Sequence, residues 1–153
     1  MTALYLEDFE AGQTFGSGQV AVTEDDIIRF ATQFDPQPFH LDPEAAQSTI
    51  FRGLAASGWH TAALTMRLLV GSEILPGNGI IGAGFDSLNW PRPVRPGDTL
   101  HVVSEALEVR RSKSRPTQGM IKVCSRTLNQ RDELVQESVG NLVVMARPSR
   151  TSR

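Results

Sequence analysis

Cysteine is almost missing from this chain of 153 residues, because Cys124 is the only one, and no disulfide can form within it. The three histidines, His40, His60 and His101, are scattered along the sequence. A structural zinc site typically uses four clustered cysteine and histidine ligands, which this sequence does not offer. We therefore expect a fold without a disulfide or a structural metal, and a chemistry that uses no metal ion.

The sequence also lacks a strong charge and a long apolar run. Its formal net charge is −2, whereas a general nucleic-acid binder needs a basic excess to neutralise phosphates. No apolar run approaches the roughly 18 residues that span a bilayer. The acidic N-terminal segment lacks the basic start and apolar core of a signal peptide. We expect a soluble, cytoplasmic protein with no nucleic-acid or membrane partner.

Helices are predicted in the first half of the sequence. Thr23 is suited to cap a helix that ends at Asp35, because the proline that follows disfavours the α conformation in the residue before it. Asp42 and Pro43 suit the first two positions of a second, short helix. A third helix, over 57–70, has so few polar side chains that we expect it to be buried.

Strands are predicted mainly in the second half. Stretches rich in β-branched and apolar residues cover about 14–22, 79–89, 98–110, 118–128 and 133–146. The segment 91–98 contains three prolines and predicts a connection. Together these elements indicate an α+β fold, with an antiparallel sheet of about five to six strands and one long buried helix. We expect a single domain over 1–147 and a disordered tail over 148–153.

The stretch 34–42 carries the clearest chemical signal. It places the carboxylate of Asp35 and the imidazole of His40 five residues apart, on a loop that two prolines stiffen. Histidine titrates near neutrality, and a partly buried aspartate can act as a base or orient a water molecule, so the pair can move protons in both directions. The alternative is structural: Asp35 caps the helix and His40 packs locally. The spacing alone does not decide between the two.

A second signal lies at the start of the long helix, where small residues occupy 55–58. Free backbone N–H groups and the positive end of the helix dipole favour negative charge there, and Gly58 lets a ligand approach the backbone. The alternative is that Ser57 is an N-cap and that small residues allow close packing. Combined with Asp35 and His40, this segment would supply an oxyanion site beside an acid and a base.

With these residues the sequence resembles the MaoC-like dehydratases, whose best-known members are (R)-specific enoyl-CoA hydratases of the hotdog fold. In that family's hydratase motif an Asp and a His stand five apart with Asn-Pro between them. A glycine eighteen residues after the His gives its N–H to the thioester oxygen. Asp35, His40, Pro38 and Gly58 match these positions, and the later segment 92–98 resembles the family's loop before a long strand. The resemblance covers about residues 5 to 146 and implies a single MaoC-like hotdog domain.

This sequence departs from the family's pattern near the catalytic pair. Gln37 stands where the family usually has Asn, and Phe34 stands where a Gly often precedes the Asp. Ser57 occupies the place before the glycine where many hydratases carry His. We interpret these departures as differences in the substrate pocket, which makes Gln37 and Ser57 candidate substrate-binding residues.

The resemblance implies a hydro-lyase of fatty acid metabolism that converts trans-2-enoyl-CoA reversibly to (R)-3-hydroxyacyl-CoA. Asp35 and His40 would deprotonate a water molecule and return a proton to C2, while the Gly58 N–H would stabilise the enolate. Which of the pair is the formal base stays open, since coupled groups titrate together. No cofactor is implied, because coenzyme A is part of the substrate. The resemblance also implies a homodimer, or a higher even oligomer, with the site near its interface.

One local basic run, 110–115, is a candidate for binding the phosphates of coenzyme A, with Arg111 and Lys113 as the candidate residues. A solvated hairpin is the equal alternative. The carrier of the acyl group can be coenzyme A or acyl carrier protein. Two rival functions remain: a thioesterase on the same fold, and an acyl-thioester-binding subunit without turnover.

Overall fold

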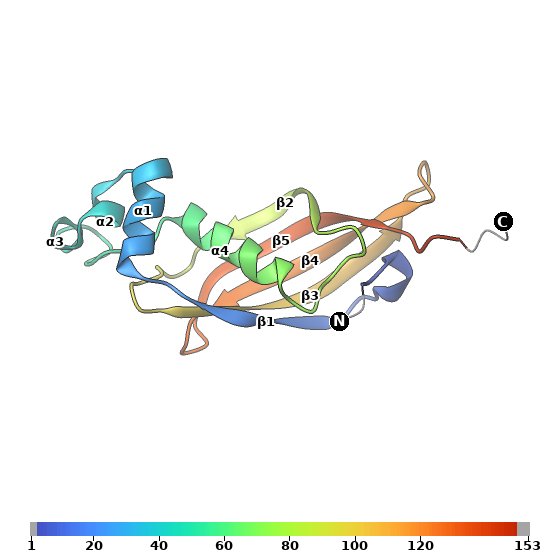
Figure 1. Cartoon of the computed structure of the whole chain (residues 1–153), viewed down its shortest axis with the longest axis horizontal. Coiled ribbons are helices and arrows are strands. Elements are labelled where there is room, and N and C mark those ends of the chain that lie inside the picture. Colours follow the sequence, from blue (N-terminus) through green and yellow to red (C-terminus); the bar gives the residue numbers. More distant parts are fainter. Residues whose placement is uncertain (1–2, 150–153) are drawn as a thin grey trace.

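One antiparallel sheet dominates residues 3–149, the part of the chain that this computed structural model describes (Figure 1). Its five strands follow the spatial order β1-β3-β4-β5-β2. They are β1 (Thr14–Ala21), β2 (Ile81–Asn89), β3 (Thr99–Arg111), β4 (Gln118–Leu128) and β5 (Leu134–Met145). The strands predicted from the sequence are confirmed to within two residues at each end. The predicted disorder over 148–153 stays a prediction, because 150–153 lie outside the described residues.

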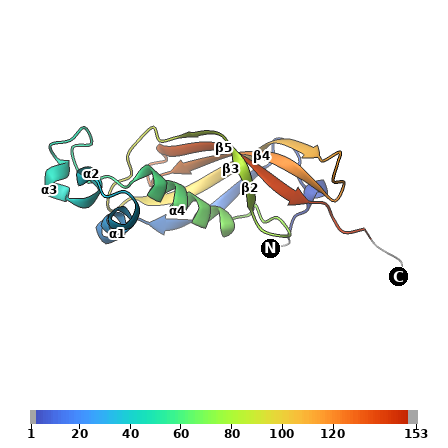
Figure 2. The ribbon, with the colours of Figure 1, turned by 90° about the horizontal axis from the view of Figure 1, so that it is seen from above.

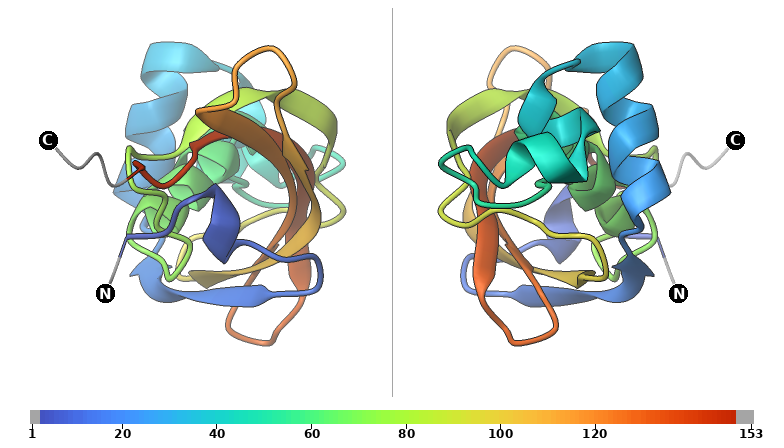
Figure 3. Two further views of the ribbon diagram at one scale, coloured as in Figure 1. Left: turned by 90° about the vertical axis from the view of Figure 1, so that its right-hand side faces the viewer. Right: turned by 90° about the vertical axis from the view of Figure 1, so that its left-hand side faces the viewer.

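Helices fill the first half of the chain, as the sequence predicts. They are the 3-10 turn η1 (Leu6–Asp8), α1 (Glu24–Phe34), α2 (Pro38–Leu41), α3 (Pro43–Ala46) and α4 (Gly58–Val70). The sheet curves around α4 (Figure 3), whereas α1, α2 and α3 gather beyond one end of the sheet (Figure 2). Within the described residues, none of the helices combines the length and the apolar character that crossing a membrane requires.

Local capping explains where the first helices begin and end. The Thr23 hydroxyl accepts a hydrogen bond from the Asp26 N–H at 3.1 Å, and α1 then runs to its C-cap, Asp35. Asp42 caps α3 by accepting from two backbone N–H groups. The sequence treats 36–41 as a loop, but Pro38 takes the first position of a one-turn helix, for which its fixed φ is suited. This turn carries His40.

A shared core holds the ends of two helices over the same part of the sheet. Ile27 on α1 and Leu68 on α4 pack with Leu100 and Val102 on β3 and with Val135 on β5. Buried and less buried positions alternate along β3, as expected for a strand with one face on the core. This packing fixes the N-terminal part of α1 relative to α4.

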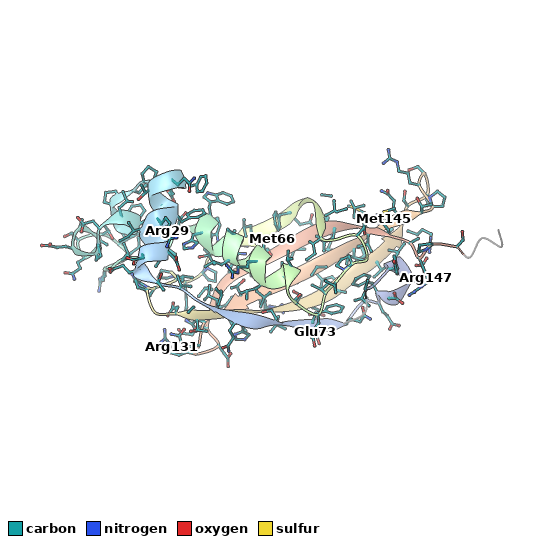
Figure 4. The ribbon with its side chains drawn as sticks, in the orientation of Figure 1. Arg29, Met66, Glu73, Arg131, Met145 and Arg147 are labelled. Carbon is teal, nitrogen blue, oxygen red and sulfur yellow. The ribbon has the colours of Figure 1, made fainter. Side chains whose placement is uncertain are left out.

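The long helix is buried on one side only, which differs from the expectation of a fully buried helix. His60, Thr61, Thr65 and Leu68 face the interior. On the other side Trp59 is 60% exposed and Met66 is 40% exposed. Met66 lies midway along α4 (Figure 4). The physical reason is that the single curved sheet covers one face of the helix, so the rest of its apolar surface has no cover within the described chain.

Candidate active site

The carboxylate of Asp35 is held between two helices. The backbone N–H of Asp35 donates to the Ala31 carbonyl at 2.8 Å, which is the last hydrogen bond of α1. One carboxylate oxygen accepts from the Gln37 side-chain amide at 2.5 Å. The other accepts from the Ser57 hydroxyl at 2.7 Å and lies 3.3 Å from Nε2 of His40. The structure therefore brings together four of the residues that the sequence singles out.

The imidazole of His40 is fixed by the backbone of a distant segment. His40 is 5% exposed, and its Nδ1 lies 2.6 Å from the Ala55 carbonyl oxygen. Because a carbonyl only accepts, Nδ1 carries the proton in this contact, which leaves Nε2 to face Asp35. The Ala55 N–H in turn donates to the Phe39 carbonyl at 3.0 Å. The Phe39 ring meets the imidazole edge-on, with centroids 4.6 Å apart.

The surroundings of Asp35 favour its ionised form. Partial burial raises the pKa of the carboxyl group. The hydrogen bonds from Gln37 and Ser57 and the charge of His40 lower this pKa, and together they outweigh burial, so the net shift is downward. Asp35 is therefore a carboxylate at neutral pH. The carboxylate accepts hydrogen bonds and Nε2 of the imidazole can accept or donate one, so the pair is suited to hold a water molecule and to exchange a proton with it.

Ser57 both caps α4 and positions the carboxylate. Its oxygen accepts from the Trp59 N–H at 3.2 Å while its O–H donates to Asp35. The sequence offered the N-cap as an alternative to a role in the site, and the structure gives Ser57 both contacts. Gly58, the first residue of α4, has a backbone N–H without an intrahelical partner. The arrangement can stabilise a negative oxygen beside the Asp35–His40 pair.

A pocket of about 650 Å³ opens beside these groups. It is lined by His40, Gly58 and Thr61, together with the loop 50–52 and the connection 90–95. This volume lies in the usual range for small-molecule sites. His40 therefore connects a cavity that a substrate can enter with the Asp35 carboxylate behind it.

Trp90 is the residue of this site that the sequence reasoning missed. A Cβ atom on Gly58 would lie 2.8 Å from the Trp90 ring, so only glycine fits beneath it. The indole N–H donates to the Gln136 side-chain oxygen at 2.8 Å, and the ring meets Trp59 edge-on at 5.3 Å. Its position, directly before the proline-rich connection, was the available signal. Nothing in the local sequence pointed to Gln136.

The predicted role of Arg111 and Lys113 is not supported within one chain. Arg111 forms an ion pair with Glu7 and donates to the Pro116 carbonyl at 2.8 Å. The Arg147 N–H and the Arg111 guanidinium lower the pKa of Glu7 to about 2. Arg147 lies at the opposite end of the molecule from α1 (Figure 4), so this end is remote from Asp35. A hairpin carries the basic run away from the Asp35–His40 pair of the same chain, and its role in binding phosphate stays a prediction.

Two other residues, His60 and Cys124, have packed surroundings that indicate a structural role. His60 stacks on Phe30, with ring centroids 4.8 Å apart. Cys124 is buried, and burial raises the pKa of its thiol. Across residues 3–149 no group of three or more His, Cys, Asp or Glu side chains is placed to hold a metal ion.

Comparison with known proteins agrees with this geometry. The family described as MaoC like domain matches residues 8–126. A crystal structure of a MaoC-like dehydratase from Rhodospirillum rubrum is 54% identical, with a TM-score of 0.93 over 96% of this chain and 100% of that one. The expected hotdog fold is thereby confirmed.

Of two further relatives, one is named as uncharacterised and the other is named as a hydratase. The uncharacterised protein YdeM of Bacillus subtilis is 34% identical over 140 residues, which are 92% of this chain and 96% of that protein. An (R)-specific enoyl-CoA hydratase from Rhodospirillum rubrum is 35% identical over 97 residues, which are 63% of this chain and 65% of the hydratase.

Proposed function

This chain belongs to the family of MaoC-like domains, and on that premise we propose that it hydrates an acyl thioester reversibly, converting trans-2-enoyl-CoA to (R)-3-hydroxyacyl-CoA. One observation carries the proposal. The carboxylate of Asp35 lies 3.3 Å from Nε2 of His40, and His40 lines a pocket together with Gly58 at the start of α4. A base, an acid and an oxyanion donor are the three groups that this reaction needs.

The steps follow from these positions. Asp35 and His40 bind a water molecule through its two O–H groups and remove one proton. The oxygen adds to C3 of the enoyl group, and the electrons of the double bond move to the thioester oxygen. There the Gly58 N–H and the positive end of α4 stabilise the enolate. The pair then returns the proton to C2, so that water is added without oxidation or reduction. The two groups act as one coupled unit.

All atoms of the product come from water and the thioester, so the proposed reaction requires no resident cofactor. Coenzyme A enters as part of the substrate. The protein supplies positions: Ser57 and Gln37 hold the Asp35 carboxylate, and the Ala55 carbonyl holds the His40 ring. Fixed donors and acceptors of this kind lose little entropy when the substrate binds.

The test is an absorbance assay with trans-2-enoyl-CoA substrates of short and medium chain length, followed by chiral analysis of the product. We expect loss of the enoyl-thioester absorbance and formation of the (R)-3-hydroxyacyl product. Release of free thiol without a hydroxyacyl product would identify a thioesterase instead. Binding of the thioester without turnover, in folded protein, would identify a binding subunit and overturn the proposal.

We also propose that two copies of the chain form a dimer through the uncovered side of α4 and the neighbouring edge strand β2. Exposed apolar side chains gather on these two elements, namely Trp59, Met66, Val70, Ile81 and Phe85. β2 ends the sheet, and an edge strand with exposed apolar residues is a surface that natural proteins usually cover. Light scattering should give twice the chain mass for the wild type and a smaller mass for Phe85→Glu.

A further inference from the structure

Three arginines, Arg52, Arg92 and Arg95, line the pocket that contains His40 and Gly58. Their surroundings differ sharply. The Arg95 guanidinium donates to the carbonyls of Gly53 at 2.9 Å and Leu54 at 3.2 Å, and also to that of Phe51. The guanidinium of Arg95 therefore binds the main chain of the loop and has few N–H donors free for a ligand.

Arg52 and Arg92 are only weakly neutralised. Arg52 is exposed, and no carboxylate of the described residues lies within ion-pair distance of its guanidinium. Arg92 is 54% exposed and approaches Glu133 no closer than 3.9 Å. By contrast, Arg126 lies 2.9 Å from its carboxylate partner. Two under-neutralised cations thus stand at the rim of one pocket.

Arg95 also joins the two segments of the chain that carry Arg52 and Arg92. It binds the carbonyls of Phe51 and Gly53, the residues on either side of Arg52, and it lies in the same proline-rich connection as Arg92. The Ala56 N–H adds a hydrogen bond of 2.9 Å to the carbonyl of Val94. The loop and the connection are therefore joined, which keeps Arg52 and Arg92 at the same pocket.

We propose that Arg52 and Arg92 bind a phosphate of the pantetheine carrier that delivers the acyl group. This inference rests on the proposed function. The thioester carbonyl must reach the Gly58 N–H inside the pocket, so the pantetheine arm and its phosphate must leave through the rim. Guanidinium groups match phosphate in geometry and charge. On a chain of net charge −2, this local positive pair also attracts an anionic carrier.

The experiment compares one enoyl group on two thiols: trans-2-butenoyl-CoA and trans-2-butenoyl-pantetheine, which has no phosphate. For Arg52→Gln with Arg92→Gln we expect KM for the CoA thioester to rise about 10- to 100-fold, with kcat unchanged. Kinetics on the pantetheine thioester should not change. Arg29→Gln with Arg126→Gln removes the same charge elsewhere and is the matched control. An equal loss on both thiols would mean a damaged pocket and would overturn the proposal.

Arg111→Gln with Lys113→Gln tests the rival basic cluster. A rise in KM for the CoA thioester in that variant alone would overturn our assignment. A third substrate, the 4′-phosphopantetheine thioester, separates the two sources of phosphate. Weakening on this substrate as well places the contact at the phosphate that coenzyme A and acyl carrier protein share. Weakening on CoA alone places it at the nucleotide phosphates. Either result supports the proposal.

Calorimetry with coenzyme A itself makes the test independent of turnover. If the wild type binds coenzyme A but hydrates no enoyl thioester, the proposed function fails while the phosphate site stands, provided that the Arg52–Arg92 variant loses binding. If the wild type and this variant bind coenzyme A equally, the phosphate site fails whatever the reaction is.

Discussion

The two ends of the molecule both gather charged side chains but place them in opposite surroundings. At the end formed by α1, α2 and the start of α4, here called the site end, His40 and Ser57 are buried around a carboxylate. At the hairpin end, formed by Glu7, Arg111 and Arg147, the charges are exposed and already paired. At the site end, His40 and Gly58 also line a pocket. At the hairpin end the Glu7 carboxylate accepts from both Arg111 and the Arg147 N–H.

The difference shows that a run of adjacent charged residues in the sequence is a poor guide to which groups can bind a ligand. The basic run 110–115 is the densest in the chain, yet Arg111 in it is occupied by Glu7. Exposed ion pairs of this kind contribute little to stability. What matters is a polar group whose position is fixed by partners on one side and whose other side is open. Asp35 and His40 meet that description, and the predictions below test it.

The largest expected effect is on the catalytic pair. Asp35→Asn and His40→Gln should each lower kcat about 10²- to 10⁴-fold, because each removes a group that transfers a proton. Folding, followed by circular dichroism, should be preserved. Asp42→Asn makes the same chemical change close by and keeps an N-cap, so it should retain activity. Substantial activity in Asp35→Asn or His40→Gln would contradict the assignment of the site end.

A smaller effect is expected from Gly58→Ala. The new Cβ would meet the Trp90 ring at 2.8 Å, so the ring or the start of α4 must shift. We expect kcat/KM to fall about 10- to 100-fold through misplacement of the N–H, and stability to fall by about 1–3 kcal/mol. Gly71→Ala, whose Cβ would come no closer than 3.9 Å to another atom, is the control. Trp90→Leu combined with Gly58→Ala should recover part of the lost stability, and failure to do so would refute the steric explanation.

The elements that the sequence predicted well are those with local signals. Thr23, Asp42 and the proline after Asp35 fix helix ends within a few residues of themselves, and the structure has those ends. Asp35 and His40 were singled out because their motif is also local. Contacts between distant segments could not be read in this way. The Ser57–Asp35 hydrogen bond and the Ala55–His40 hydrogen bond depend on how α1 and α4 pack.

Trp90 and the arginines show the same limit in physical terms. Trp90 reaches Gly58 only because β2 ends beside the start of α4, and no spacing in the sequence reports that. Arg52 and Arg92 are isolated cations in the sequence, and the loop contacts of Arg95 bring them to one rim. The run 110–115 looked stronger because its charges are adjacent in sequence.

Ser57→Ala should act mainly through the ionisation of Asp35. It removes a hydrogen bond that lowers the pKa of the carboxyl group, so this pKa should rise. The acid limb of the kcat/KM profile should then move to higher pH. Thr23→Ala removes an N-cap from α1 without touching Asp35, so it should cost a similar ~1 kcal/mol of stability and leave the profile in place. Identical profiles in both variants would show that Ser57 acts only as a cap.

The same bond predicts how stability depends on pH. Because the pKa of Asp35 is lower in the folded state, its ionised form stabilises the fold at neutral pH, and this contribution is lost as the pH falls through the folded-state pKa. The part of the Ser57→Ala deficit that comes from Asp35 should therefore shrink in acid. Urea unfolding of the wild type and the variant at several pH values would measure this.

The smallest effect should come from the hairpin end. Glu7→Gln removes a carboxylate that accepts from Arg111 and from the Arg147 N–H, but both partners stay in contact with water. We expect the melting temperature to fall by at most a few degrees and less in high salt, with kcat unchanged. If instead Glu7→Gln lowered kcat as Ser57→Ala does, the hairpin end would be coupled to the reaction. A second copy of the chain would then have to bring the two ends together, and the comparison drawn from one chain would fail.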